Sequence, residues 1–201
     1  MRKNFAMALM FVILGLASAC SSVPIDTSTA APIASPTKIA SATPTAQATK
    51  FVLHSPEVVE GGALPRDYTC DGSSATLPLE WRGAPTGTSS FAVVMHHIPP
   101  EITPHWYWVV YNIPAKVTSF PKNMSGIGKL GNNSVNKKLE FSPPCSKGAG
   151  EKIYTYTVYA LSAEPQFAVP ASQVNREVLL AAIKDNILAS AELNVTYARA
   201  R

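Results

Sequence analysis

The sequence carries little charge: Asp, Glu, Lys and Arg make up 15% of its 201 residues, against 46% hydrophobic residues. This balance excludes a chain that is disordered throughout, because such chains combine low hydrophobicity with high charge. The net charge of +4 falls to +2 when Arg2 and Lys3 are set aside, leaving 15 basic and 13 acidic residues. Nucleic-acid-binding domains usually carry a clustered basic face. We therefore expect no nucleic acid among the partners.

Catalytic motifs are also missing. The sequence has no G-x-S-x-G elbow, no P-loop and no G-x-G-x-x-G run, since Gly126 and Gly128 lack a third glycine. The few acidic residues are scattered, which does not favour a hydrolase built on paired carboxylates. We expect a protein that is not an enzyme and has no cofactor, and a hydrolase is the weakest of the functions considered.

Metal-ligand spacings are absent as well. His96, His97 and His105 fall within ten residues, but no H-E-x-x-H run is present. His96 and His97 are neighbours at the end of a predicted strand, so their side chains should point to opposite faces of a sheet. We expect no metal site, and instead a hydrogen-bonding role for a histidine in a cleft wall.

Only the N-terminus has a long apolar run. Residues 1–4 include the basic Arg2 and Lys3, residues 5–16 are apolar, and small residues 17–19 precede Cys20. Twelve apolar residues are too few to span a bilayer comfortably. The segment resembles a bacterial lipoprotein signal, so residues 1–20 are predicted to be a signal peptide ending at a lipidated Cys20. Ala17 stands where such signals usually have Leu, and the alternative is simple cleavage with Cys20 unmodified.

Residues 21–49 have no aromatic residue, and 22 of the 29 are Ser, Thr, Ala or Pro. Such a segment cannot offset its ordering entropy by burial. It is predicted to be a disordered tether that holds a folded domain, residues 50–201, away from a membrane; the alternative is a disordered leader with no spacing role. The protein would then be lipid-anchored in the bacterial cell envelope; the alternative is a secreted or periplasmic soluble protein.

The domain contains short β-like runs bounded by Gly, Pro and Asn. One helical pattern stands out, with Asn175 as N-cap and apolar residues at spacings of three and four as far as Ile187. A second short helix is predicted over residues 187–191. We expect a mainly β fold, a β-sandwich with short C-terminal helices. The predicted strands cover residues 51–53, 77–81, 90–95, 106–113, 152–161 and 193–197.

Two cysteines remain if Cys20 is lipidated. Cys70 and Cys145 form an even pair in a compartment where disulfides persist, so we expect a disulfide between them. Two buried free thiols are the alternative.

Several segments of the domain are similar to one known family. They occur in the family's order and cover about residues 51–199. They are residues 68–72 (YTCDG), 77–81 (LPLEW), 83–91, 108–114 (WVVYNIP), 131–132, 142–144 (SPP), 154–161 and the Tyr197-x-Arg199 end. Together they resemble the bacterial Raf-kinase-inhibitor-like branch of the phosphatidylethanolamine-binding proteins. The resemblance implies a β-sandwich of a large and a small sheet, with an anion-binding cleft at one edge.

The cleft residues depart from that family's pattern. A DPDxP motif, a His on the next strand and an HRY triplet build the family's cleft. Here His97 falls within the first motif, Tyr107 replaces the strand His, Lys152 replaces the triplet His, and Tyr154 is retained. These four side chains are predicted to converge near Asp71, Pro143 and Pro144, with no carboxylate opposite Lys152.

Strand alternation adds that Trp106 and Trp108 should share a core face, while Tyr107 and Tyr111 look toward the cleft. Phenol and ammonium groups can donate to an anion. The leading hypothesis is thus a non-catalytic module that binds a small anion or a phospholipid headgroup. The alternative is an inhibitor-like protein-interaction module, with a protein partner and a degenerate pocket.

Overall fold

The computed structural model describes residues 50–99, 103–146 and 148–199. The predicted signal peptide over residues 1–20 and the predicted tether over residues 21–49 lie outside these ranges. No helix within them has the length and apolar character needed to cross a membrane.

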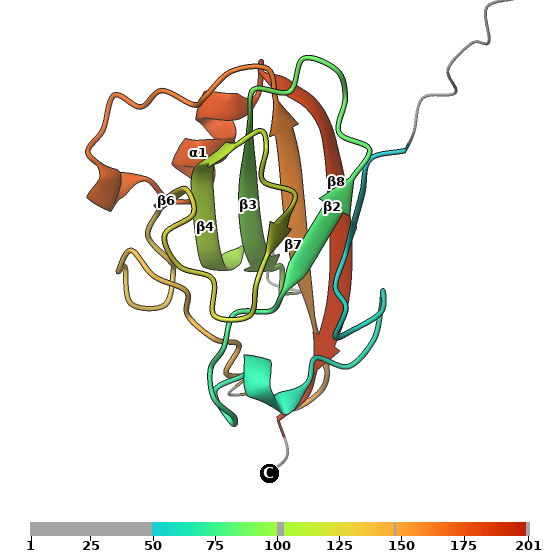
Figure 1. The fold of residues 1–201 in the computed structure, drawn as a ribbon. Helices are drawn as coiled ribbons and strands as arrows, with labels where there is room; N and C mark the ends of the chain where they lie inside the picture. The colour runs from blue at the N-terminus through green and yellow to red at the C-terminus, as the bar shows by residue number, and fades with distance from the viewer. Residues whose placement is uncertain (1–49, 100–102, 147, 200–201) are drawn as a thin grey trace, which may run out of the picture. The chain divides into compact units, whose positions relative to one another are not determined.

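Two antiparallel sheets form the domain (Figure 1). The strand order is β1-β2-β5 in the small sheet and β6-β4-β3-β7-β8 in the large one. The β-sandwich of a large and a small sheet is therefore confirmed. The strands are β1 (Val52–His54), β2 (Leu79–Arg82), β3 (Ser90–His97), β4 (His105–Pro114), β5 (Ser119–Phe120), β6 (Lys129–Leu130), β7 (Lys152–Leu161) and β8 (Ile187–Tyr197).

The core lies between the sheets and is built by side-chain alternation. In β2, Leu79 and Trp81 are buried while Glu80 and Arg82 are exposed. Trp81 packs edge-on against Phe120 of β5, with ring centroids 5.2 Å apart. β3 is buried along its whole length. The small sheet covers one of its faces, and the helix described next packs on the other, which we call the helix side.

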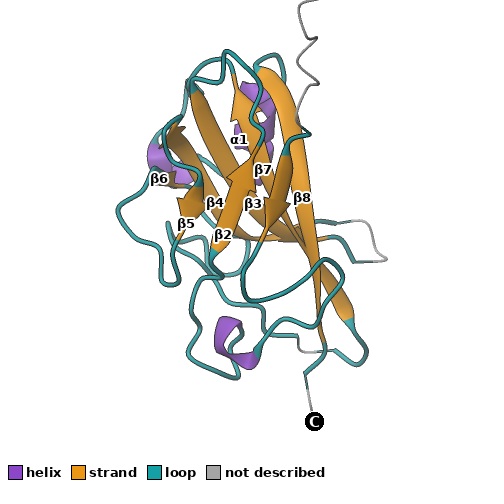
Figure 2. Ribbon diagram, turned by 45° about the vertical axis from the view of Figure 1, so that its right-hand side comes forward, coloured by secondary structure: helices purple, strands orange, loops and turns teal. Residues whose placement is uncertain are grey.

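Helix α1 (Arg176–Ile183) packs on the face of the large sheet that is turned away from the small sheet (Figure 2). Asn175 caps it as predicted, since its side chain accepts a hydrogen bond from the Val178 amide at 2.8 Å. Two short 3₁₀ turns, Arg66–Tyr68 and Ala171–Gln173, are the other helical segments in the described residues.

The predicted second helix over residues 187–191 is wrong. This segment is the first half of β8 and pairs with β7, with Ile187 opposite Leu161 and Ala191 opposite Val158. Hydrogen bonding to an otherwise open sheet edge overrides the local helical preference. For the same reason α1 ends at Ile183 and does not continue to Ile187.

Strict alternation along β4 predicts one face for Trp106 and Trp108 and the other for Tyr107 and Tyr111. This prediction is also wrong, because two register shifts interrupt the pairing of β4 with β3. Trp106 lies opposite His96 but Trp108 lies opposite Met95, so Tyr107 is an extra residue between them. This β-bulge turns Tyr107 and Trp108 to the core side of the sheet and leaves Trp106 on the helix side. The second shift, at Asn112 with φ of 53°, leaves Tyr111 on the helix side too.

Candidate functional site

A cavity of about 860 Å³ lies at one end of the large sheet. β3 ends there at His97, while β4 and β7 begin there at His105 and Lys152. Antiparallel pairing places His97 directly opposite His105, so both rings reach the same end of the sheet. The cavity is lined by Cys70, His97, Pro99, His105, Tyr107, Ser134, Val135, Ser142, Pro143, Cys145, Gly148, Ala149, Glu151 and Lys152.

Three of the predicted cleft residues, His97, Tyr107 and Lys152, line this cavity. The bulge in β4 brings Tyr107 there. Burial raises the pKa of its phenol, with an opposing effect from the Tyr154 hydroxyl, so Tyr107 is a protonated donor at neutral pH. Nδ1 of His97 lies 2.7 Å from the carbonyl oxygen of Ile153. A carbonyl only accepts, so Nδ1 carries the proton in that bond and Nε2 stays available to a ligand.

Tyr154 lies beneath the cavity and does not line it. Its side chain is 1% exposed, and its ring centroid is 5.4 Å from that of His97 and 5.3 Å from that of Tyr107. Burial is the main reason why the pKa of its phenol is raised, and Tyr107 adds to the effect. Tyr154 therefore holds the two lining rings in position.

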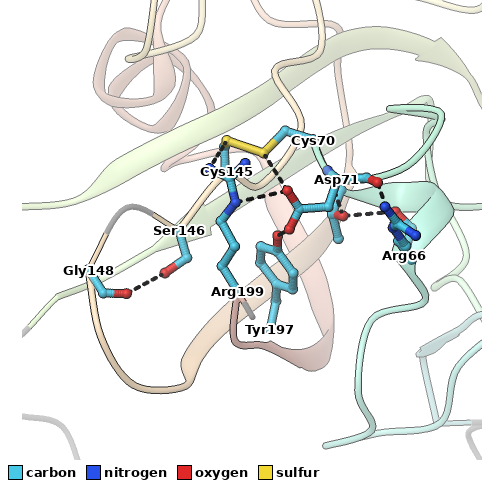
Figure 3. Close-up of a disulfide and its surroundings, with 9 residues drawn as sticks. Arg66, Cys70, Asp71, Cys145, Ser146, Gly148, Tyr197 and Arg199 are labelled. Atoms are coloured by element: carbon cyan, nitrogen blue, oxygen red, sulfur yellow. Dashed lines mark hydrogen bonds and ion pairs between the residues drawn. A yellow bond between two sulfur atoms is a disulfide. The ribbon is translucent and has the colours of Figure 1, made fainter. Parts of the chain in front are cut away.

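Cys70 and Cys145 both line the cavity. They are joined by the disulfide drawn in Figure 3, and their Cα atoms are 5.2 Å apart. This is the pair expected from the sequence. The Cys70 amide also donates to the carbonyl oxygen of Pro144 at 3.0 Å, so the two loops are joined twice. Pro143 lines the cavity, while Pro144 is buried behind it.

Asp71 lies on the other side of the disulfide and lines a second cavity of about 720 Å³. Its carboxylate accepts a hydrogen bond from the Tyr197 hydroxyl and pairs with Nε of Arg199 at 2.8 Å (Figure 3). Nε of Arg66 donates to the Asp71 carbonyl oxygen at 2.6 Å. The Tyr197 hydrogen bond first, and then the two arginines, lower the pKa of Asp71. Asp71 is thus bound to its own neighbours rather than turned to the first cavity.

The structure adds lining residues that the sequence analysis missed, and one of them corrects it. The exposed Glu151 lines both cavities, so the cavity that Lys152 lines has an acidic residue on it as well. Glu151 directly precedes the strand that carries Lys152, and that adjacency was the available signal. His105 can be recognised as a cavity-lining residue only once its pairing with His97 across the two strands is known.

His96 lies outside the cavity. It faces the helix side of the sheet, and its ring is nearly buried. Burial above all, followed by the charges of Arg176 and His97, lowers its pKa to about 4. The two adjacent histidines thus occupy different environments. Within the described residues no group of three or more His, Cys, Asp or Glu side chains is placed to hold a metal ion.

Comparison with known proteins gives consistent results. Residues 54–198 match the family model described as phosphatidylethanolamine-binding protein. The chain is 34% identical over 146 residues to a UPF0098 protein of Aquifex aeolicus, covering 69% of this chain and 83% of that protein. It is 30% identical over 178 residues to the UPF0098 protein YbcL of Escherichia coli, covering 80% and 94% respectively.

Solved structures are similar to the domain as well. The crystal structure of Escherichia coli YbcL, described as a new member of the mammalian PEBP family, superposes with a TM-score of 0.67 at 27% identity. It covers 76% of this chain and all of that one. A phosphatidylethanolamine-binding protein homologue of Chlamydia trachomatis gives the same TM-score at 26% identity, covering 75% of this chain and 98% of that one.

Proposed function

Since the chain belongs to the phosphatidylethanolamine-binding protein family, we propose that its domain binds a small phosphate-bearing ligand, such as a phospholipid headgroup, in the 860 Å³ cavity. The observation that carries the proposal is the meeting of a phenol, an imidazole and an ammonium group on one cavity. These groups belong to Tyr107, His97 and Lys152.

Two of these groups, the phenol and the ammonium group, suit a phosphate because each donates a hydrogen bond toward an oxygen anion. Hydrogen bonds to charged groups contribute roughly 1.5–3 kcal/mol each, about twice a neutral one. Lys152 supplies a point charge, and Tyr107 supplies a neutral donor that its raised pKa keeps protonated. Because Nδ1–H is bonded to the Ile153 carbonyl oxygen, His97 Nε2 accepts a hydrogen bond from an N–H or O–H of the ligand.

Glu151 makes a zwitterionic headgroup a better fit than a bare anion. Its carboxylate on the same cavity would repel a second negative group and attract an ammonium group. The remaining lining includes the apolar surfaces of Pro99, Val135 and Pro143, which suit the glycerol or acyl part of a lipid. Phosphoethanolamine is accordingly the simplest probe, and inorganic phosphate is its matched comparison.

The proposed role is binding without catalysis. The two cysteine sulfurs on the cavity are joined to each other, and the Ser134 hydroxyl donates to the Trp106 carbonyl oxygen at 2.9 Å. These groups are therefore not arranged as a nucleophile with an adjacent base.

Isothermal titration calorimetry tests the proposal with phosphoethanolamine, inorganic phosphate and ethanolamine on the full chain. Binding should follow the phosphate and strengthen with the amine. Lys152→Gln should weaken it about tenfold or more, and Tyr107→Phe less. Lys184→Gln, which changes an exposed lysine just beyond α1, is the matched control and should bind as the wild type does. Absence of heat with every phosphate compound would reject the proposal in favour of the protein-interaction alternative.

We further propose that the domain is held at the bacterial envelope by a lipid on Cys20, with residues 21–49 as spacer. The support is the sequence alone: a basic start, an apolar run of twelve and small residues before the cysteine. The mature protein should fractionate with membranes, and Cys20→Ala should release it or block its processing. An intact mass that shows an unmodified N-terminus would contradict the anchor.

A further inference from the structure

The two sulfur atoms of the disulfide have neighbours of opposite charge. Nη1 of Arg199 lies 3.6 Å from Sγ of Cys145, whereas Oδ1 of Asp71 lies 3.9 Å from Sγ of Cys70 (Figure 3). Nε of the same Arg199 pairs with the same Asp71, so the two charges are fixed relative to each other and to the S–S bond. The surroundings of the disulfide are therefore polarised along its length.

Both charges are present at neutral pH. An arginine side chain stays protonated in proteins. The pKa of Asp71 is lowered, chiefly by the Tyr197 hydrogen bond and then by Arg199 and Arg66, so its carboxylate is ionised. When a disulfide is cleaved, one sulfur leaves as a thiolate, and the sulfur whose thiolate is better stabilised leaves faster. Here that sulfur belongs to Cys145.

The disulfide is also open to a reagent. Cys70 and Cys145 are both half-buried rather than enclosed, and both line the 860 Å³ cavity. A small thiol entering this cavity reaches the S–S bond without unfolding of the domain. Disulfides within a closed core lack such access.

We propose that the Cys70–Cys145 disulfide is a thiol-exchange site that opens in one direction, with attack at Cys70 and departure of Cys145, and that its substrate class is small-molecule thiols and dithiols. The attacking thiolate forms a new S–S bond with Sγ of Cys70. The Cys70–Cys145 bond breaks, and its electron pair leaves on Sγ of Cys145 beside the Arg199 guanidinium.

A dithiol completes the reduction. Its second thiolate attacks its own sulfur in the mixed disulfide, so the dithiol closes to a cyclic disulfide and Cys70 leaves as a thiolate. Two electrons pass from the dithiol to the protein. The protons lost by the dithiol go to water, and the two cysteine thiolates take up protons according to the pH.

The direction of attack can be measured on the wild-type full chain. Glutathione is added for short times, the reaction is stopped with acid, free thiols are blocked with a maleimide, and tryptic peptides are analysed by mass spectrometry. Glutathione should be found on Cys70 and the maleimide on Cys145, with at least about a fivefold excess over the reverse pattern. Cys20 falls on a separate peptide and is not scored.

A matched pair of variants tests the cause. Arg199→Gln removes the charge beside Cys145 and should slow the exchange about three- to tenfold. Arg82→Gln removes an exposed guanidinium on β2, in the small sheet, and should leave the rate unchanged. Circular dichroism and thermal melting check that each variant is folded.

In the wild type, equal amounts of the two glutathione adducts, or an excess of the adduct on Cys145, would by themselves overturn the proposal. Equal slowing by the two arginine variants would overturn it as well. The exchange does not depend on the proposed ligand. If the protein binds no phosphate compound but forms the Cys70 adduct, the proposed binding function is rejected and the thiol-exchange proposal stands.

Discussion

The buried His96 makes the stability of the domain depend on pH in a calculable way. Its side chain faces Arg176 of α1, and its Nδ1 atom has no hydrogen-bond partner among the described residues. Burial first, and then the charges of Arg176 and His97, lower its pKa from 6.5 to about 4. The folded state therefore takes up this proton at a lower pH than the unfolded state does.

The sign and size of the effect follow from this difference. Above pH 6.5 His96 is neutral in both states and has no effect. As the pH falls from 6.5 toward 4, the unfolded chain is protonated first, so the free energy of unfolding decreases. With one pKa unit equal to about 1.4 kcal/mol, the loss at pH 5 is about 2 kcal/mol. For a domain of about 150 residues this lowers Tm by roughly 4–8 °C.

Urea unfolding at pH 7.5 and pH 5.0 measures this loss in the wild type and in His96→Gln. Glutamine keeps polar atoms at the site but does not titrate in this range. Acid effects from other residues are common to both proteins, so only the difference between the two pH-induced losses is interpreted. The wild type should lose about 2 kcal/mol more than the variant. Equal losses in the two proteins would refute the assignment of a strongly lowered pKa to His96.

Two further predictions concern the fold. Replacing both Cys70 and Cys145 by Ser should lower the free energy of unfolding by about 4 kcal/mol in the chain-entropy model, because the bridge closes a loop over a sequence separation of 75 residues. Thermal melting with and without reductant checks this. A reductant-sensitive melt in the double variant would contradict it. Asn175→Ala should lower the free energy of unfolding by about 1 kcal/mol, because the Val178 amide loses its acceptor, whereas Asn175→Asp should keep most of that stability. Chemical unfolding measures both variants. An unchanged unfolding midpoint in Asn175→Ala would exclude the cap.

The sequence predicts the strands whose own residues favour extended backbone and fails where tertiary pairing decides. The strand over residues 152–161 is found with the predicted bounds, because its β-branched and aromatic residues favour a strand and the neighbouring strands keep them paired. Residues 187–191 form a strand although their local pattern favours a helix. The edge of β7 decides their structure, and no local pattern contains that information.

The candidate site is predictable only in part, for a related reason. Tyr107 reaches the cavity through a β-bulge, and strict alternation assigns the wrong face to its neighbour Trp106. Asp71 directly follows Cys70, which lines the cavity. Tyr197 and Arg199, near the C-terminus, nevertheless hold Asp71 on the other side of the disulfide. Such long-range contacts follow from strand register, which the sequence pattern does not fix.

Binding in the cavity is the central claim, and the location of a bound ligand tests it most directly. Two-dimensional ¹H–¹⁵N NMR of the ¹⁵N-labelled protein, titrated with phosphoethanolamine, reports which backbone amides sense the ligand. The largest saturable shifts should fall on His97, Tyr107 and Lys152 and on the disulfide loops beside them, while β1, β2 and β5 stay unaffected. Shifts confined to the small sheet, or a spectrum unchanged at saturating ligand, would contradict the claim.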